Sequence, residues 1–342
     1  MLDKKTVFIL GAGASCPYGY PSGEHLRRRI CLPTSMLVEK QRELISAIGS
    51  PNIYSEFRKK FENSSTKSID IFIARNPKLA PIGKILVAFE IFEAEQRSMF
   101  REKAEWEQYR LRIPGYITGQ DTYIMSKNFQ GSIWYEYLYD RLTSGLANKD
   151  SLPDFSNGNL SFITFNYDRS LEYFLYESLR NSFTEVPEPQ IVQCLKQLKI
   201  LHIYGQIAPL KWQDAVKGID YHPPIDALLL RNTSSNIRTI YEEQKHPELI
   251  EALDLIRQAG QIFFLGFSYA PENMDILGLP ATIPPGPCRV YGTAFGLNDA
   301  EVKKISSQTR QGLRADHVDS KNPGRVVIEA MDCLELLRNY LN

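Results

Sequence analysis

The sequence lacks the features of several large protein classes. Its five cysteines, among 342 residues, are odd in number and far apart, and no C-x-x-C pair is present to bind zinc or to act as a redox couple. Lys plus Arg total 40 and Asp plus Glu total 40, so no net charge draws the chain to nucleic acid or to an anionic membrane surface. We therefore expect reduced core thiols, no metal, no membrane association and no direct nucleic-acid binding.

Long apolar runs are also missing. The longest, residues 82–92, contains Lys84 and Glu90. It is too short to cross a bilayer, which needs about 20 apolar residues. Residues 4–14 imitate a secretory signal, but their apolar core, residues 7–10, is shorter than the roughly 7 to 15 residues that such a signal has. We expect a cytoplasmic protein.

What the sequence does contain is an alternation of strand-like and helix-like segments. Hydrophobic residues make up 43% of the chain and charged residues 23%, which is ordinary for a globular protein. Amphipathic segments such as 169–183 and 247–259 separate short apolar runs, a pattern that predicts a doubly wound, mostly parallel, Rossmann-like α/β sheet. The expected strands are residues 6–10, 160–165, 199–204, 225–230, 261–267, 288–293 and 325–330.

The region between the first two runs has a different character. Residues 36–48, 82–111 and 132–146 show helical periodicity with few strand signals between them. We interpret residues 35–150 as a large helical insertion domain within a Rossmann-type domain formed by residues 1–34 and 151–342. The Pro- and Gly-rich residues 271–287 predict a long loop.

The first strand is followed by a glycine-rich turn, Gly11-Ala12-Gly13-Ala14-Ser15. Glycines let a backbone turn tightly and approach a pyrophosphate, which the amides of a following helix stabilise. An ordinary strand-to-helix turn is the alternative. Cys16 stands where the dehydrogenase pattern G-x-G-x-x-G has its third glycine, and no strand ends in an acidic residue about 20 residues later. A hydride-transferring enzyme is therefore disfavoured.

Polar residues and glycines also follow the other predicted strands. Asn166 and Asp168 come after residues 160–165, where helix capping is the alternative role. His202 and Tyr204 lie in 199–204, where alternation places both on one face, although a lone strand histidine is more often a core residue. Because ligands bind beyond the carboxyl ends of strands in open α/β sheets, we expect one shared crevice. Three further candidates at these ends are Gly205, Gly266 and Ser268.

Taken together, these segments resemble the sirtuin-like NAD-consuming family, especially its bacterial antiphage members with a helical insertion and no zinc ribbon. The residues that carry the resemblance are GAGAS (11–15), PSG (21–23), ITFNYD (163–168), LHIYGQI (201–207) and FLGFSY (264–269). SIDIFIARNP (68–77) is also similar to a segment of those proteins. The resemblance covers most of the chain and is strongest over about residues 6–30 and 160–295.

The resemblance implies that NAD is a substrate. It assigns Gly205 to the cofactor-binding residues, with Gly266 and Ser268 near the adenosine ribose, and it places Asn166 and Asp168 beside the nicotinamide ribose. Around the pyrophosphate it implies Gly11, Ala12, Gly13 and Ser15.

A histidine that directly precedes the glycine acts as general base in deacetylating members of this family. The residue at that position is Tyr204, and His202 lies two residues earlier, so both stay candidates for the catalytic position. The absence of four zinc-binding cysteines removes part of the cleft for acyl-lysine. Hydrolysis of NAD is therefore favoured over protein deacylation.

The predicted function is an NAD+ hydrolase that acts in antiphage defence by depleting NAD. The alternatives are a protein deacylase or ADP-ribosyltransferase, and a catalytically inactive nucleotide-binding scaffold. We expect a homo-oligomer, and the resemblance adds a HerA-type ATPase or a short Argonaute as partner. Aromatic residues in the helical region are of the kind enriched at interfaces, although packing within its own core is the alternative. They are Trp106, Tyr109, Trp134, Tyr135, Tyr137 and Tyr139.

Overall fold

A computed structural model describes residues 2–37, 39–48, 51–100, 133–146, 151–243, 246–284, 287–311 and 325–341. At its centre, these residues form a six-stranded, all-parallel sheet with the strand order β3-β2-β1-β4-β5-β6. The predicted doubly wound fold is confirmed. The strands are β1 (Thr6–Leu10), β2 (Leu160–Thr164), β3 (Lys199–His202), β4 (Gln261–Leu265), β5 (Arg289–Thr293) and β6 (Val326–Glu329).

The three central strands are buried along their whole length. This burial explains why β1, β2 and β4 are continuous apolar runs and do not alternate with polar residues. Phe8 of β1 lies opposite Phe162 and Phe263 in the strand register, and its ring stacks on both with centroid separations of 5.2 Å. Such pairs contribute about 0.5 to 1.5 kcal/mol beyond the burial of their area. This row of three stacked phenylalanine rings favours the observed register of β1, β2 and β4.

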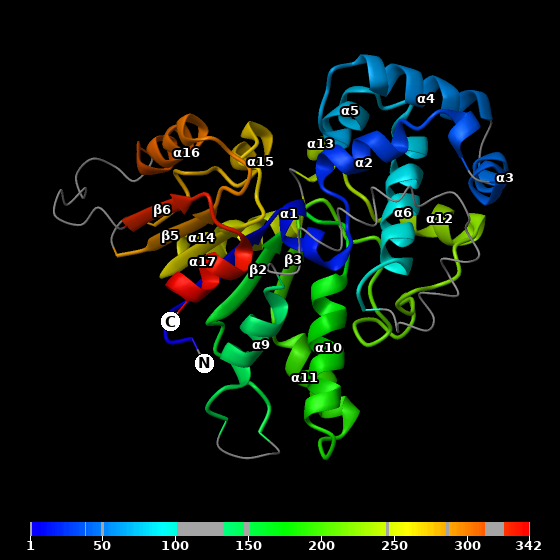
Figure 1. Ribbon diagram of the computed structural model, residues 1–342. Coiled ribbons are helices and arrows are strands. Elements are labelled where there is room, and N and C mark those ends of the chain that lie inside the picture. Colours follow the sequence, from blue (N-terminus) through cyan, green and yellow to red (C-terminus); the bar gives the residue numbers. More distant parts are fainter. Residues whose placement is uncertain are drawn as a thin grey trace.

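The strand order reverses next to β1. The chain runs outward from β1 through β2 to β3, then returns to place β4 on the other side of β1. In open α/β sheets, ligands bind in the crevice at such a reversal, beyond the carboxyl ends of the strands. The short helix α1 (Ala12–Ser15) begins at this point, at the centre of Figure 1.

Helices flank the sheet and connect its strands. The predicted amphipathic segments 169–183 and 247–259 are confirmed as α10 (Ser170–Ser182) and α14 (Pro247–Arg257). Pro247 occupies the first helical turn, where its missing N–H costs no hydrogen bond. Further helices of this part include α11 (Glu188–Lys196), α16 (Asp299–Gln311) and α17 (Cys333–Tyr340).

All regular elements described between β1 and β2 are helices, as predicted for a helical insertion. Figure 1 shows α3 to α6 grouped with α2, α12 (Ala227–Ser234) and α13 (Ile240–Glu243) to one side of the sheet. The long helix α6 packs against α2, α4, α5 and α12 at the centre of this group. The described helices between β1 and β2 are α1, η1 (Cys16–Tyr18), α2 (Gly23–Ile30), η2 (Thr34–Met36), α3 (Glu39–Ile48), α4 (Pro51–Asn63), α5 (Ile69–Arg75), α6 (Ala80–Gln96) and α9 (Tyr135–Thr143).

Two predictions in the second half of the chain are wrong. Residues 225–230 were expected to form a strand, but Asp226 caps the helix α12 (Ala227–Ser234) by accepting a hydrogen bond from the Leu229 amide. A short apolar run cannot distinguish a strand from a buried helical face by periodicity alone. The predicted loop 271–287 begins with the helix α15 (Pro271–Ile276), because proline suits a first helical turn. A further short helix is α13 (Ile240–Glu243).

Two of the predicted interface aromatics belong to the core. Trp134 and Tyr135 are 0% and 1% exposed, whereas Tyr137 and Tyr139 are partly buried against the core. The Tyr18 hydroxyl accepts hydrogen bonds from the amides of Trp134 (2.9 Å) and Tyr135 (2.7 Å) at the start of α9. Trp134 and Tyr135 therefore cannot contribute to an interface in this fold. Trp106 and Tyr109 lie outside the described residues.

All five cysteines are free and four are buried, as predicted. Burial raises the pKa of Cys16 to about 12 and that of Cys194 to about 11, so these thiols are poor nucleophiles. Within the described ranges, no helix combines the length and apolarity needed to cross a membrane.

Candidate functional site

The glycine-rich turn after β1 packs directly on the turn after β4. A Cβ atom at Gly11 would lie 2.5 Å from the Gly266 carbonyl oxygen, and one at Gly13 would lie 2.8 Å from the Gly266 Cα atom. Gly266 itself has a φ of 56°, in the left-handed region that favours glycine. Close approach of the two backbones therefore explains all three glycines without a ligand.

This contact also uses one main-chain donor of the first turn. The Gly13 amide donates to the Gly266 carbonyl (3.0 Å), and the Ala14 amide donates to the Gly11 carbonyl (2.9 Å). Ala12, as the first residue of α1, has an amide with no acceptor within the helix, and it is partly exposed. The Ala12 amide is therefore the donor of the predicted pyrophosphate-binding turn that is best placed to bind an anion.

Two other predicted cofactor-binding residues differ in their surroundings. Gly205 has a φ of 80°, and a Cβ atom there would lie 1.9 Å from the Asn236 carbonyl oxygen, so chain packing requires glycine. Ser268 follows β4 and is exposed. Of these two residues, Ser268 offers an accessible hydroxyl at the carboxyl end of the sheet.

Asn166 is held in a single orientation directly after β2. Its side-chain Nδ2 donates to the Gly11 carbonyl and to Ser15 Oγ, both at 3.0 Å. Because a carbonyl oxygen can only accept, the amide nitrogen must face Gly11. The Asn166 Oδ1 atom is buried and has no hydrogen-bond partner among the residues that the structure describes. A fixed acceptor with unused capacity is the clearest ligand-directed feature of the site.

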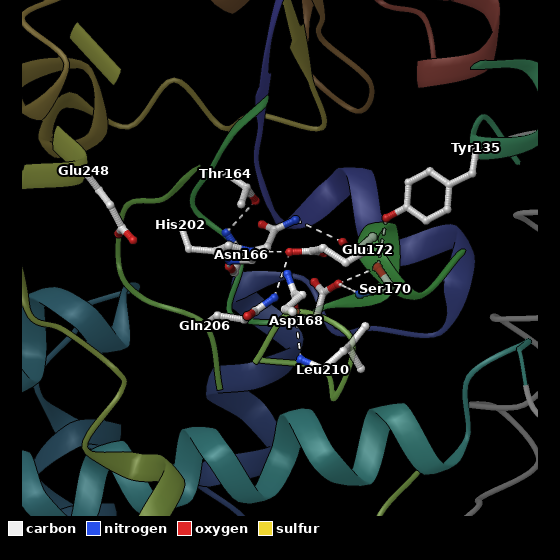
Figure 2. A network of polar contacts seen from close by, with 12 residues as sticks. Tyr135, Thr164, Asn166, Asp168, Ser170, Glu172, His202, Gln206, Leu210 and Glu248 are labelled. Atoms are coloured by element: carbon white, nitrogen blue, oxygen red, sulfur yellow. Dashed lines mark hydrogen bonds and ion pairs between the residues drawn. The ribbon is translucent and has the colours of Figure 1, made fainter. Parts of the chain in front are cut away.

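Asp168 accepts hydrogen bonds at the start of α10, one residue before the N-cap position, which Arg169 occupies. Its Oδ1 atom accepts hydrogen bonds from the Ser170 amide, at 3.1 Å, and from the Ser170 hydroxyl at the start of α10. The Tyr135 hydroxyl contacts Ser170 Oγ at 2.9 Å, which extends the network to α9 (Figure 2). Burial raises the pKa of Asp168, although hydrogen bonds from Ser170 and Ser15 oppose that shift. The carboxyl group is part of a buried network that borders Asn166.

His202 lies at the end of β3 with both ring nitrogens in contact with oxygen atoms. Its Nδ1 atom is 2.9 Å from the Asn166 carbonyl oxygen, and its Nε2 atom is 2.6 Å from Oε1 of Glu172 in α10. The Gln206 side chain donates to the same Glu172 oxygen at 2.7 Å (Figure 2). His202 and Asn166 are therefore neighbours, as expected, but through the main chain of Asn166.

Tyr204 makes contacts different from those of His202. Its hydroxyl donates to Oδ1 of Asn273 in α15 at 2.9 Å, and its ring packs edge-on against Phe165. The expectation that strand alternation sends both side chains to one place is wrong, because β3 ends at His202. The Gly205 amide instead donates to the His202 carbonyl in a turn.

Several polar partners of the site were not predicted from the sequence. Glu172 is 2% exposed and occurs on α10 three and seven residues before the buried Leu175 and Leu179. A carboxylate on an apolar helical stripe was the signal that could have identified it. Asp70 of α5 accepts a hydrogen bond from the hydroxyl of Tyr167, between Asn166 and Asp168, and no local pattern indicates that long-range contact.

Arg169, the next residue after Asp168, is fully buried. Its Nε and Nη2 atoms donate to the two carboxylate oxygens of Glu95 in α6, both at 2.9 Å. Further hydrogen bonds reach the carbonyls of Ile219 (2.8 Å) and Asp220 (2.6 Å). This bidentate pair connects the loop after β2 to the helical region and to residues 219–220.

Comparison of the chain with protein-family models and with curated proteins gives no match in either case. The sirtuin-like assignment therefore stays a prediction. Among the residues described, no group of three or more His, Cys, Asp or Glu side chains is arranged to hold a metal ion.

Ser15, Asn166, Asp168 and His202 form one connected cluster at the carboxyl ends of β1, β2 and β3. Its chemistry follows from the roles of its members. Both ring nitrogens of His202 contact protein oxygens, and Asp168 accepts a hydrogen bond from the Ser170 amide at the start of α10. The Asn166 oxygen is left to accept a hydrogen bond from a bound hydroxyl or water and to face a developing positive charge.

Proposed function

We propose that this protein cleaves the nicotinamide glycosidic bond of NAD+ and releases nicotinamide and ADP-ribose. The observation that carries the proposal is the buried Asn166 Oδ1 atom, which lacks a partner within the described ranges while the amide nitrogen is fixed by Gly11 and Ser15. A buried acceptor without a donor costs about 1 to 3 kcal/mol. A ribose hydroxyl or an attacking water satisfies it.

The same atom suits the charge that develops during cleavage. Departure of nicotinamide leaves an oxocarbenium-like ribose, and the negative end of a fixed amide dipole stabilises positive charge without reorganisation. The Asn166 side-chain amide is fixed by the Gly11 carbonyl, directly after β1, and by Ser15 Oγ of α1. Asn166 is therefore the residue proposed to touch the reacting ribose or water.

The location supports a dinucleotide substrate. The cluster lies beside the reversal of strand order between β1 and β4, where open α/β sheets bind nucleotides. On this proposal, the partly exposed Ala12 amide meets the pyrophosphate, and the exposed Ser268 hydroxyl contacts the adenosine part. Gly11, Gly13 and Gly266 contribute by allowing the turns after β1 and β4 to pack closely against each other.

A catalytically inactive nucleotide-binding scaffold is the second candidate. It is favoured by Tyr204 at the position where the resemblance implies a histidine, and by a His202 whose ring nitrogens are both engaged. A deacylase or ADP-ribosyltransferase is the third. If NAD+ cleavage is the activity, NAD depletion in antiphage defence, a homo-oligomeric assembly and an ATPase or Argonaute partner are further proposals that follow from the resemblance.

The test is incubation of the concentrated, purified protein with NAD+, followed by chromatographic separation of nicotinamide, ADP-ribose and cyclic ADP-ribose. Asn166→Ala should lower the rate by about 10² to 10³, the effect of removing one oriented electrostatic group. Asn181→Ala is the matched control, because Asn181 is exposed at the far end of α10 and its side-chain amide donates to Glu177, on the same helix.

Three outcomes separate the candidates. Nicotinamide release by the wild-type protein without any peptide, lost in Asn166→Ala and kept in Asn181→Ala, supports the hydrolase. Release only after addition of an acylated peptide or an acceptor protein indicates a transferase. ADP-ribose binding by calorimetry without release of nicotinamide indicates the scaffold.

A further inference from the structure

We propose that His202 is a positioning residue, held as an imidazolium cation between Glu172 and the main chain of Asn166, and not the general base of the site. The imidazolium fixes the residue that carries the unpaired amide oxygen. The effect on catalysis rests on the proposed NAD+ cleavage, whereas the protonation state of the ring can be measured without it.

The hydrogen-bond partners determine the protonation of the ring. The Asn166 carbonyl oxygen, 2.9 Å from Nδ1, can only accept, so Nδ1 carries a proton. Glu172 Oε1 accepts from the Gln206 amide at 2.7 Å, and an ionised carboxylate oxygen has further lone pairs with which to accept from Nε2 as well. The Nε2 to Oε1 distance of 2.6 Å fits a charge-assisted bond. In the proposed imidazolium, both ring nitrogens are donors and each has a protein acceptor.

This arrangement leaves no nitrogen for a ribose hydroxyl. A general base must present an unprotonated atom within hydrogen-bond reach of the proton that it removes. His202 is 7% exposed, and each of its nitrogens points at a protein oxygen. Using either nitrogen as a base would require breaking a buried contact to Asn166 or Glu172.

The contacts of Asn166 explain what the cation does. The main-chain N–H of Asn166 donates to Thr164 Oγ1 at 3.0 Å. Its side-chain Nδ2 atom donates to the Gly11 carbonyl and to Ser15 Oγ. The His202 ring holds the remaining main-chain group, the carbonyl. Because the ring comes from β3 and is anchored to α10, it fixes the loop after β2 from two directions. The Asn166 side-chain oxygen is then aimed by a rigid main chain.

The charged groups around the ring come from three directions. Glu172 projects from α10, and Asp168 lies in the loop after β2. Arg238 donates to the carbonyl of His202 itself, and its guanidinium pairs with Glu248 of α14. Burial lowers the pKa of His202, but Glu172, the Asn166 carbonyl and Asp168 raise it, and the net direction is upward.

The first experiment measures the ring directly. Protein labelled with ¹⁵N-histidine is examined by NMR from pH 6 to pH 9, and the His202 signals are identified by their absence in His202→Asn. We expect both ring nitrogens to have imidazolium shifts at pH 7.5, above the ordinary histidine pKa of about 6.5. A neutral ring at that pH overturns the proposal. This result is obtained whether or not the protein cleaves NAD+.

The second experiment separates positioning from base catalysis by rescue. His202→Asn places an amide donor near the position of Nδ1 and can restore the bond to the Asn166 carbonyl, whereas His202→Ala cannot. If His202 only positions Asn166, the asparagine variant should keep NAD+ cleavage within about tenfold of wild type, because loss of a general base costs about 10² to 10⁴. The alanine variant should lose more. The exposed His25 provides the control variant His25→Asn.

Equal loss of activity in folded His202→Asn and His202→Ala, with NAD+ cleavage intact in the wild type and in His25→Asn, overturns the positioning role. Absence of cleavage in the wild type contradicts the proposed function instead. In that case the NMR titration still decides whether His202 is the buried cation.

Discussion

The Tyr167 hydroxyl donates a hydrogen bond to the carboxylate of Asp70, which connects α5 to the loop between Asn166 and Asp168. The Ser68 hydroxyl donates to the other Asp70 oxygen at 3.2 Å. Both carboxylate oxygens of Asp70 are therefore paired, one with the N-cap residue of α5 and one with the candidate site. The segment 68–77, noticed in the sequence for its resemblance alone, has a physical connection to the site.

Removal of the Tyr167 hydroxyl should destabilise the protein more than neutralisation of Asp70. Burial raises the pKa of Asp70, and the Tyr167 hydrogen bond opposes that shift. Tyr167→Phe leaves a buried carboxyl oxygen without its donor, at a cost of about 1 to 3 kcal/mol. Asp70→Asn keeps an oxygen acceptor and removes the buried charge. Urea denaturation of both variants checks this order, and a larger loss for Asp70→Asn contradicts it.

Stability should decrease with rising pH because of His202. The folded pKa is raised above the unfolded value of about 6.5, so the folded protein binds more protons than the unfolded chain between the two values. The contribution of the His202–Glu172 pair is fully present below about pH 6.5 and is lost as the pH rises through the folded pKa. Urea denaturation at several pH values between 6 and 8.5 should show a decline in wild type that is smaller in His202→Asn. Parallel curves for the two proteins contradict this assignment.

The buried Arg169–Glu95 pair should show strong coupling. Both side chains are 0% exposed, so Glu95→Gln or Arg169→Met leaves a buried charge without its full partner. Breaking such a pair from one side typically costs about 3 to 5 kcal/mol. The double variant should cost less than the sum of the two single variants, since no buried charge is left alone. A double-mutant cycle from denaturation curves measures the coupling, and additive losses exclude it.

Two glycines with similar backbone angles provide a matched comparison. Gly266 and Gly296 have φ values of 56° and 79°. A Cβ atom at Gly266 would lie 1.9 Å from the Ala14 amide nitrogen, whereas one at Gly296 meets nothing within 4 Å in the described structure. Gly296→Ala should cost about 1 to 2 kcal/mol, from the backbone conformation alone. Gly266→Ala should either fail to fold or lose several times more unfolding free energy than Gly296→Ala. Thermal denaturation of both variants measures the difference. Equal losses would show that the two turns can separate.

The sheet was predictable from the sequence because its central strands are buried on both faces. Burial on both sides makes β1, β2 and β4 continuous apolar runs, which stand out from the amphipathic helices between them. The run at 225–230 is also short and apolar, but it becomes the capped helix α12, because Asp226 and tertiary packing decide its state. Local pattern carries no information on that packing.

The neighbourhood of the site was also predictable, but the pairings within it were not. Parallel strand ends meet at one edge, so Asn166, Asp168 and His202 had to lie close together. The partner of each side chain depends on elements far away in the chain. Glu172 of α10 contacts His202 at the end of β3, and Asp70 of α5 contacts Tyr167 in the loop after β2. Neither contact has a sequence spacing that identifies it.

The contact between Tyr18 and the start of α9 has a consequence for the order of folding. Trp134, the residue before α9, provides no side-chain cap, and the first amides of the helix donate to a hydroxyl 116 and 117 residues earlier in the chain. A helix of nine residues is marginal on its own. Closing so long a segment also costs chain entropy before the contact forms. We therefore expect α9 to become ordered only after η1 has docked on the sheet, so that this helix forms late in the folding reaction.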